Sequence, residues 1–288
     1  MASKLLKSLL FGGGALAVLA TGAAFASGGG ETGDYKMVHK HWHFNGPFGT
    51  YDREAMQRGY QVYREVCASC HQLKHLSFRH LGDKGGPFYM EEYANPNDNP
   101  YVKNFAADWF VEDIDADTGD VTERPGTPSD HFPPIFPNPA AARASNGGAV
   151  PPDLSIVVSA REGGADYVYN LLTAYDTPKP ADVELTTGQH YNPVMDGGKI
   201  AMAPPLTDGL IEYAPIVSED EEGNVVETPG PEATVEQMAA DVSEFLAWSA
   251  DPKMEQRKYT GAMTMIYLLI LSLLLWLTYK RVWRKVEH

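Results

Sequence analysis

The sequence predicts a mainly α-helical domain with long proline-rich loops, followed by one membrane-spanning helix near the C-terminus. Three observations predict this class. Apolar residues recur with helical spacing in residues 52–66 and 234–250, a run of 21 uncharged residues occupies 259–279, and prolines punctuate the chain between the two helical segments. A helical repeat gathers apolar side chains on one face, and about 20 apolar residues cross a bilayer. Residues 27–258 are therefore expected to form a single domain with inserted loops.

The first amphipathic segment leads directly into the pair of cysteines. Thr50 or Asp52 is its expected N-cap, because short polar side chains accept hydrogen bonds from the first free backbone N–H groups of a helix. Its apolar side is expected to comprise Met56, Gly59, Tyr60, Tyr63 and Val66. This helix therefore delivers the chain to Cys67.

The second amphipathic segment begins with Thr234 and Gln237, at the spacing of a capping box. Its expected apolar stripe is Val235, Met238, Ala239, Val242, Phe245 and Leu246. Prolines between the two segments favour irregular loops over long helices, since proline lacks the N–H that a helix interior needs. Short hairpins are expected around residues 117–120 and 222–224.

The N-terminus has the pattern of a secretory signal peptide. Lys4 and Lys7 precede an apolar stretch at 9–19, and Ala-Phe-Ala at 24–26 is a small-residue cleavage site. Residues 1–26 are therefore expected to be removed. An uncleaved N-terminal anchor is the alternative, although the apolar stretch is shorter than the ~20 residues of a membrane span. Both interpretations export the domain.

The uncharged run at 259–279 is the strongest structural signal. A buried helix of a soluble protein is the alternative, but the run lacks a polar face. The basic residues that follow in 280–288 favour a cytoplasmic tail, and Arg257 and Lys258 on the other side weaken this asymmetry without reversing it. The sequence thus predicts a single-pass protein of a bacterial inner membrane, with its domain in the periplasm.

The charge balance is acidic, with 23 Lys and Arg against 38 Asp and Glu. Without the leader and the tail, 17 basic and 37 acidic residues remain. Such a balance argues against nucleic acid, whose phosphates require basic contacts, and it favours basic partners. The acidic runs at 112–117 and 219–222 are candidate contributors, although a charge run also suits a solvated loop.

Cys67 and Cys70 are the only cysteines, and with His71 they form Cys-x-x-Cys-His. This is the attachment pattern of c-type haem, in which two thiols bond the porphyrin and the histidine ligates the iron. A zinc site is one alternative, but it needs four ligands. A thioredoxin-like dithiol is another, but there a helix follows the pair, whereas here a helix precedes it. The motif therefore predicts one covalent haem c.

An electron-carrying haem needs a sixth iron ligand, and a methionine thioether suits that role. Met202 lies among small residues and just before Pro204 and Pro205, which fix the backbone. Met202 is therefore the expected distal ligand. Met195 or a histidine is the alternative, with Met202 as ordinary core filler.

At this point the sequence resembles the cytochrome c1 family. The resemblance runs in order through FNGPFGT (44–50), RGYQVY (58–63), CASCH (67–71), FRHL (78–81), RPG (124–126), NGGAVPPDLS (146–155), AREGG (160–164), DYV (166–168), YNP (191–193) and MAPP (202–205). It covers most of the chain after the leader. It implies a class I cytochrome c-like core enlarged by insertions and tethered by one C-terminal helix.

The resemblance also implies roles for individual residues. Cys67 and Cys70 match the thioether sites, His71 the proximal ligand and Met202 the distal ligand. Arg161 matches an arginine that pairs with a haem propionate, and a surface salt bridge is its alternative. Asn146, Pro151 and Tyr167 match haem-pocket positions, with plain loop structure as the alternative for each.

By the same resemblance the chain would accept one electron from the Rieske iron-sulfur protein and pass it to a soluble basic c-type cytochrome. Its other expected partners are a cytochrome b subunit, the lipid bilayer and a second copy of the complex. The isolated chain would be an electron carrier, and quinol:cytochrome c oxidoreductase activity would belong to the whole cytochrome bc1 complex. Alternatives are a membrane-bound cytochrome of another oxidase or dehydrogenase and a periplasmic thiol-disulfide enzyme.

Overall fold

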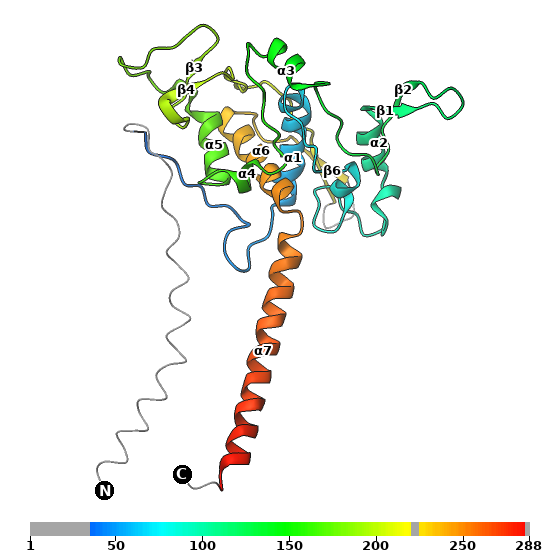
Figure 1. Cartoon of the computed structure of the whole chain (residues 1–288), viewed down its shortest axis with the longest axis vertical. Helices are drawn as coiled ribbons and strands as arrows, with labels where there is room; N and C mark the ends of the chain where they lie inside the picture. The colour runs from blue at the N-terminus through cyan, green and yellow to red at the C-terminus, as the bar shows by residue number, and fades with distance from the viewer. Residues whose placement is uncertain (1–34, 220–224, 286–288) are drawn as a thin grey trace. The chain divides into compact units, whose positions relative to one another are not determined.

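The computed structural model describes residues 35–219 and 225–285, and the expected signal peptide at 1–26 lies outside them. The described chain is mainly α-helical, which confirms the predicted fold class (Figure 1). Its α-helices are α1 Arg53–Glu65, α2 Pro100–Ala107, α3 Pro139–Ser145, α4 Val157–Ala160, α5 Ala165–Thr173, α6 Val235–Ala250 and α7 Met254–Trp283. The proline-rich middle of the chain thus holds helices of nine residues or fewer.

Helix α1 begins after Asp52, whose side chain accepts hydrogen bonds from the backbone N–H groups of Glu54 and Ala55 at 3.0 and 3.1 Å. Asp52 is therefore the cap, in preference to Thr50. The buried side of α1 consists of Met56, Gly59, Tyr60, Val62 and Tyr63, and Val66 is partly buried. The predicted apolar side is confirmed, with Val62 added.

Helix α6 packs beside α1 (Figure 1). The Thr234 hydroxyl accepts a hydrogen bond from the Gln237 N–H at 3.1 Å, so half of the expected capping box is present. The Gln237 side chain binds Asp241 at 2.9 Å and does not return to the cap. The predicted apolar stripe faces the core, but the polar side chains of Asp241, Ser243 and Glu244 are buried as well.

The core between these helices and the neighbouring loops is rich in aromatic rings. Tyr60 lies 4.9 Å from Phe105 and 5.6 Å from Phe245 between ring centroids, and Phe78 lies 4.2 Å from Phe132. Large apolar rings bury much surface and interlock in tilted or edge-on pairs. This core holds the start of the haem motif in place, because Ala68 belongs to it.

In residues 35–219 and 225–285 the strands form three small antiparallel pairs. They are β1 Phe110–Ile114 with β2 Val121–Pro125, β3 His190–Tyr191 with β4 Lys199–Ile200, and β5 Ile216–Glu219 with β6 Val225–Thr228. The β1–β2 turn spans the hairpin expected at 117–120. The second expected turn, at 222–224, lies outside the described residues, between the paired strands β5 and β6. Short 3-10 turns complete the chain: Cys67–Ser69, Phe78–Gly82, Pro96–Asp98, Ala174–Asp176 and Asp196–Gly198.

Helix α7 is 30 residues long and apolar enough to cross a membrane. The side chains of its apolar stretch are not buried against the rest of the described chain. Its Thr264 and Thr278 hydroxyls donate to the carbonyl oxygens of Thr260 and Leu274, four residues earlier, at 2.8 Å. Internal pairing of this kind is what a hydrocarbon environment demands of polar groups. The predicted run at 259–279 lies wholly inside this helix.

Candidate haem site

The two thiols lie on a single tight turn at the end of α1. The Cys67 carbonyl oxygen accepts hydrogen bonds from the N–H groups of Cys70 and His71 at 3.1 and 2.8 Å. This turn places both sulfurs and the histidine on one short segment. Burial, and to a smaller extent Cys70, raises the pKa of the Cys67 thiol to about 12. A thiol-disulfide catalyst needs a lowered thiol pKa, so this environment is unlike one.

His71 is oriented by a carbonyl group from a distant loop. Its Nδ1 lies 2.8 Å from the carbonyl oxygen of Pro152. A carbonyl oxygen can only accept, so Nδ1 carries the hydrogen and Nε2 keeps its lone pair. Burial lowers the pKa of this histidine, which keeps the ring neutral. A neutral imidazole with one nitrogen held by a backbone acceptor is the usual form of a metal-ligating histidine.

The loop that carries Pro152 is fixed against the chain after His71. The Leu154 N–H donates to the Gln72 carbonyl oxygen at 2.9 Å, and the Asp153 carboxylate accepts from the Lys74 N–H at 3.0 Å. The Ser155 carbonyl oxygen accepts from the Ser249 hydroxyl of α6 at 3.0 Å. Pro151, a predicted pocket residue, is thereby held next to the residue that orients His71.

Met202 has its backbone held by a tyrosine from another segment. The Tyr175 hydroxyl donates to the Met202 carbonyl oxygen at 3.0 Å, and the Met202 side chain is half-buried. The alternative ligand Met195 has a different environment, because its sulfur lies 3.4 Å from the Tyr167 hydroxyl. This hydrogen bond uses one of the two lone pairs of the Met195 sulfur, so it does not decide between the two methionines. Met202 stays the predicted iron ligand.

Arg161 and Tyr167, both predicted pocket residues, lie together. The Arg161 guanidinium lies 5.9 Å from the centre of the Tyr167 ring. Within the described part of the chain, no salt bridge joins Arg161 to a carboxylate, so the surface ion pair that was its alternative is not formed there. The guanidinium charge is thus available for an acidic group such as a haem propionate.

Asn146 has a local role. It ends α3, and its side-chain amide donates to the Ala142 carbonyl oxygen at 2.7 Å. The amide thus stabilises the end of its own helix, and the haem-pocket role of this residue stays a prediction. The sequence did not predict two residues that contact the expected iron ligands. They are Pro152, whose carbonyl oxygen orients His71, and Tyr175, whose hydroxyl binds the Met202 carbonyl oxygen. The spacing of eight residues between Tyr167 and Tyr175 was the one available signal, because it places both on one side of a continued helix.

The donor set fits a haem better than a bare metal ion. In residues 35–219 and 225–285, no group of three or more His, Cys, Asp or Glu side chains could hold a metal ion. A zinc site would need four such ligands, whereas a porphyrin supplies four of six iron ligands itself. Two thiols, an imidazole held through Nδ1 and a guanidinium without a salt bridge among the described residues would suit the attachment, iron-ligand and propionate groups of a haem.

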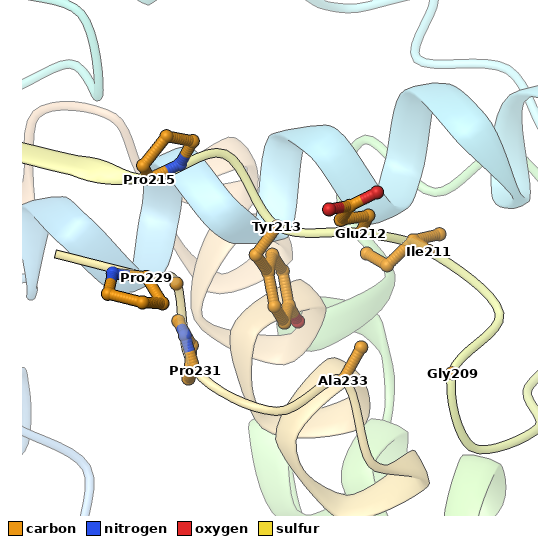
Figure 2. A pocket seen from close by; sticks show the side chains of 9 residues that line it. Gly209, Ile211, Glu212, Tyr213, Pro215, Pro229, Pro231 and Ala233 are labelled. Carbon is orange, nitrogen blue, oxygen red and sulfur yellow. The ribbon is translucent and has the colours of Figure 1, made fainter. Parts of the chain in front are cut away.

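Two cavities lie away from this site. One, of about 320 Å³, is bordered by residues 209–215 and 229–233, and Figure 2 shows the Tyr213 ring directed toward α6. The other, of about 640 Å³, lies between residues 75–86 and the junction of α6 with α7. Neither is lined by a predicted haem residue.

A mainly α-helical domain with a Cys-x-x-Cys-His turn and a C-terminal helix long and apolar enough to cross a membrane fits the class of membrane-anchored cytochromes. Comparison with known proteins narrows this class. The model of the Cytochrome C1 family matches residues 42–286. The chain therefore belongs to the cytochrome c1 family, which carries haem and transfers electrons in the cytochrome bc1 complex.

Relatives support this membership. The chain is 36% identical to cytochrome c1 of Rhodospirillum rubrum, over 94% of this chain and 97% of that protein. It is 44% identical to the mitochondrial cytochrome c1 heme protein of Saccharomyces cerevisiae, over 81% of this chain and 67% of that one. It is 39% identical to cytochrome b/c1 of Bradyrhizobium diazoefficiens over 93% of this chain, but it spans only 39% of that protein's length.

Proposed function

We propose that this chain carries one covalent haem c that accepts an electron from a Rieske iron-sulfur protein and passes it to a soluble basic c-type cytochrome. The hydrogen bond between His71 Nδ1 and the Pro152 carbonyl oxygen is the observation that carries this proposal, because it leaves Nε2 ready to bind iron. When bound, the haem iron would cycle between the ferric and ferrous states and so hold one electron at a time.

The residues of this chain would attach, orient and shield the haem. Cys67 and Cys70 would form the thioethers, and His71 and Met202 would ligate the iron. Arg161 would pair with a propionate, and Pro151 and Tyr167 would line the pocket. Asn146 would support the pocket indirectly, through the end of α3. A methionine ligand favours the ferrous state and thus a high potential.

The proposed membrane topology of the domain rests on the sequence patterns of the N-terminal and C-terminal segments. Residues 1–26 would be the cleaved leader, 27–258 the periplasmic haem domain, 259–279 the membrane anchor and 280–288 the cytoplasmic tail of an inner-membrane protein. The domain would sit beside a cytochrome b subunit in a dimeric complex, where it completes quinol:cytochrome c oxidoreductase. The excess of acidic residues suits a basic electron acceptor.

A spectral comparison of two methionine variants tests the ligand assignment. We expect Met202→Leu to lower the reduction potential by a large amount and to allow carbon monoxide to bind the reduced protein, because the distal position opens. Met195→Leu is the matched control, and its potential should stay near that of the unchanged protein. The opposite ranking would move the distal ligand to Met195.

Purification from the membrane tests the assembly. A haem-bearing particle that also contains cytochrome b and a Rieske protein supports the proposal. Isolation with a different oxidase or dehydrogenase instead would assign the chain to that complex. Purified chain without a haem absorption band, and with both thiols open to alkylation, would contradict covalent haem altogether.

A further inference from the structure

The loop at residues 43–50, just before α1, carries a large apolar side chain at its tip. Phe48 is 86% exposed. The base of the loop is packed into the domain, because the Phe44 ring lies 5.7 Å from that of Trp42 and 5.3 Å from that of Tyr51. The Thr50 N–H closes the loop by donating to the His43 carbonyl oxygen at 3.1 Å. The tip therefore projects from a fixed base.

The shape of the tip depends on two glycines. Gly46 has a φ of +78°, which favours glycine, and a Cβ atom at Gly49 would lie 2.2 Å from the Asn45 carbonyl oxygen. Residues 44–50 contain no charged side chain. The tip is thus narrow, neutral and apolar at its end.

This loop is bound to the first turns of α7. The Lys258 ammonium group donates to the carbonyl oxygens of Phe44 and Gly49 at 2.6 and 2.9 Å. The Tyr51 N–H donates to the Glu255 carboxylate at 2.8 Å. In Figure 1 the loop, in blue, lies beside the beginning of α7. Lys258 directly precedes the uncharged run of 259–279, and one helical turn rises about 5.4 Å. The mouth of the loop thus lies within about a turn of the point where the apolar span begins.

We propose that the loop at 43–50 docks on the lipid bilayer, with Phe48 inserted among the headgroups and upper acyl chains. Three observations favour lipid as the occupant. The loop is hydrogen-bonded to the start of the membrane span. Its tip has no charged side chain, so insertion would not require a charge to lose its hydration. Tyr259, on the adjacent turn of α7, is 70% exposed. Aromatic side chains concentrate at this depth of a membrane.

Such docking gives the haem domain a second attachment to the membrane. A domain held by one helix can turn about that helix, whereas a second contact beside it restricts the rotation. The loop would thus fix which side of the domain faces away from the bilayer. This role is independent of the electron-transfer partners.

Spin labels on single cysteines test the proposal in the full-length haem protein placed in phosphatidylcholine nanodiscs. Phe48→Cys reports on the tip, and Asn45→Cys reports on the same loop with Phe48 retained. Phe110→Cys is the matched control, because Phe110 is an aromatic residue 64% exposed on β1. Protein without a new cysteine gives the background from Cys67 and Cys70.

We expect the label at 48 to collide more often with oxygen, which dissolves in lipid, and several-fold less often with a water-soluble nickel chelate than the label at 110. The label at 45 should fall between them. Equal nickel accessibility at 48 and 110 would overturn the proposal, since it would place the tip in water. Protection of position 48 from both reagents in the purified complex would also overturn it, since it would assign the loop to a protein partner.

Discussion

Asp241 is the residue on which the buried polar contacts between α1 and α6 converge. Its side chain is 2% exposed and accepts hydrogen bonds from Arg58 Nε at 3.0 Å and Nη2 at 2.9 Å. Tyr213 Oη and Gln237 Nε2 each donate to it at 2.9 Å. A buried carboxylate is tolerated only when its charge and lone pairs are matched in this way.

Removal of this charge should be costly. We predict that Asp241→Asn lowers the free energy of unfolding by about 3 kcal/mol, because Arg58 would stay largely buried without its counter-charge. Asp108→Asn is the control. Asp108 pairs with Arg64 at 2.5 Å, but both side chains are more than 40% exposed, so its loss should cost less than about 1 kcal/mol. Equal losses in denaturant titrations of the two variants would contradict the assignment.

Glu244 is a second buried carboxyl group on α6, and it accepts a hydrogen bond from the Asp52 N–H at 2.9 Å. Its pKa is raised to about 7, chiefly by burial, with the carboxylates of Asp52 and Asp241 adding to the rise. The folded protein thus holds this proton up to a higher pH than the unfolded chain does. Ionisation of Glu244 therefore disfavours the folded state.

The pH dependence of stability follows with a definite sign. Between about pH 4.5 and pH 7 the unfolded chain binds fewer protons at this position, so the Glu244 contribution to stability falls as the pH rises. We predict that Glu244→Gln becomes more stable relative to the unchanged protein across this window, by about 1–3 kcal/mol in total. Urea titrations at a series of pH values would show this, and a constant difference between the two proteins would contradict it.

At the residue scale the sequence predicts which side chains could bind a cofactor better than it predicts which distant groups contact them. Cys-x-x-Cys-His predicts haem attachment without further context, because both thiols and the imidazole are neighbours in the chain. The Pro152 carbonyl oxygen lies 81 positions from His71 and is a backbone atom, so no side-chain pattern marks it. Asp241 and Glu244 lie outside the apolar stripe that the sequence predicts for α6, and the partners that accompany their burial, Arg58 and Asp52, lie far away in the chain.

At the scale of elements, the crossing of α1 and α6 depends on Gly59. A Cβ atom there would lie 2.0 Å from the Asp241 carbonyl oxygen and 2.7 Å from the Phe245 Cβ. Two backbones can approach this closely only where a side chain is missing. Gly59 therefore sets the distance between the two main helices.

A methyl group at this crossing should force the helices apart. We predict that Gly59→Ala lowers the free energy of unfolding by about 2–3 kcal/mol, although alanine is the better helix former. Gly261→Ala is the control, because Gly261 lies on α7 with no atom within 4 Å of the added methyl group. Thermal unfolding of both variants, followed by circular dichroism, measures the difference. A stabilised Gly59→Ala protein would show that the crossing has room.

The long elements were predictable because their signals are local. The Asp52 and Thr234 caps and the apolar repeats lie within the helices that they define, and the uncharged run lies within α7. The short helices α2 to α5 were not located in advance. They are four to nine residues long, which is too short for a helical repeat of apolar residues to be recognised. An asparagine cap followed by proline begins both α2 and α3, but the sequence has many other prolines, so this signal alone does not locate a helix.

At the scale of the whole molecule, negative charge dominates the domain. Acidic residues outnumber basic ones by 38 to 23 in the full chain. In the described hairpin β1–β2, Glu112 and Glu123 lie directly opposite each other, and neither forms a salt bridge with another described residue, so this part of the surface presents negative charge. Long-range attraction of this kind speeds encounter and weakens as salt shortens the screening length.

Electron delivery should therefore depend on ionic strength. We predict that the second-order rate of electron transfer from the purified complex to a basic c-type cytochrome falls about tenfold or more between roughly 10 and 200 mM salt. Transfer to a neutral small-molecule oxidant is the control and should change little. A flat profile with the cytochrome would show that the charge of the domain does not guide this partner.

The pairing of α1 with α6 also affects the order in which parts of the domain fold. Arg58 and Asp241 are 183 positions apart, so α1 is synthesised long before its partner helix. Contacts between such remote segments form late in folding. The stretch with both thiols therefore spends the interval without its main packing partner, and in the proposed covalent haem protein this interval would leave both sulfurs accessible for attachment.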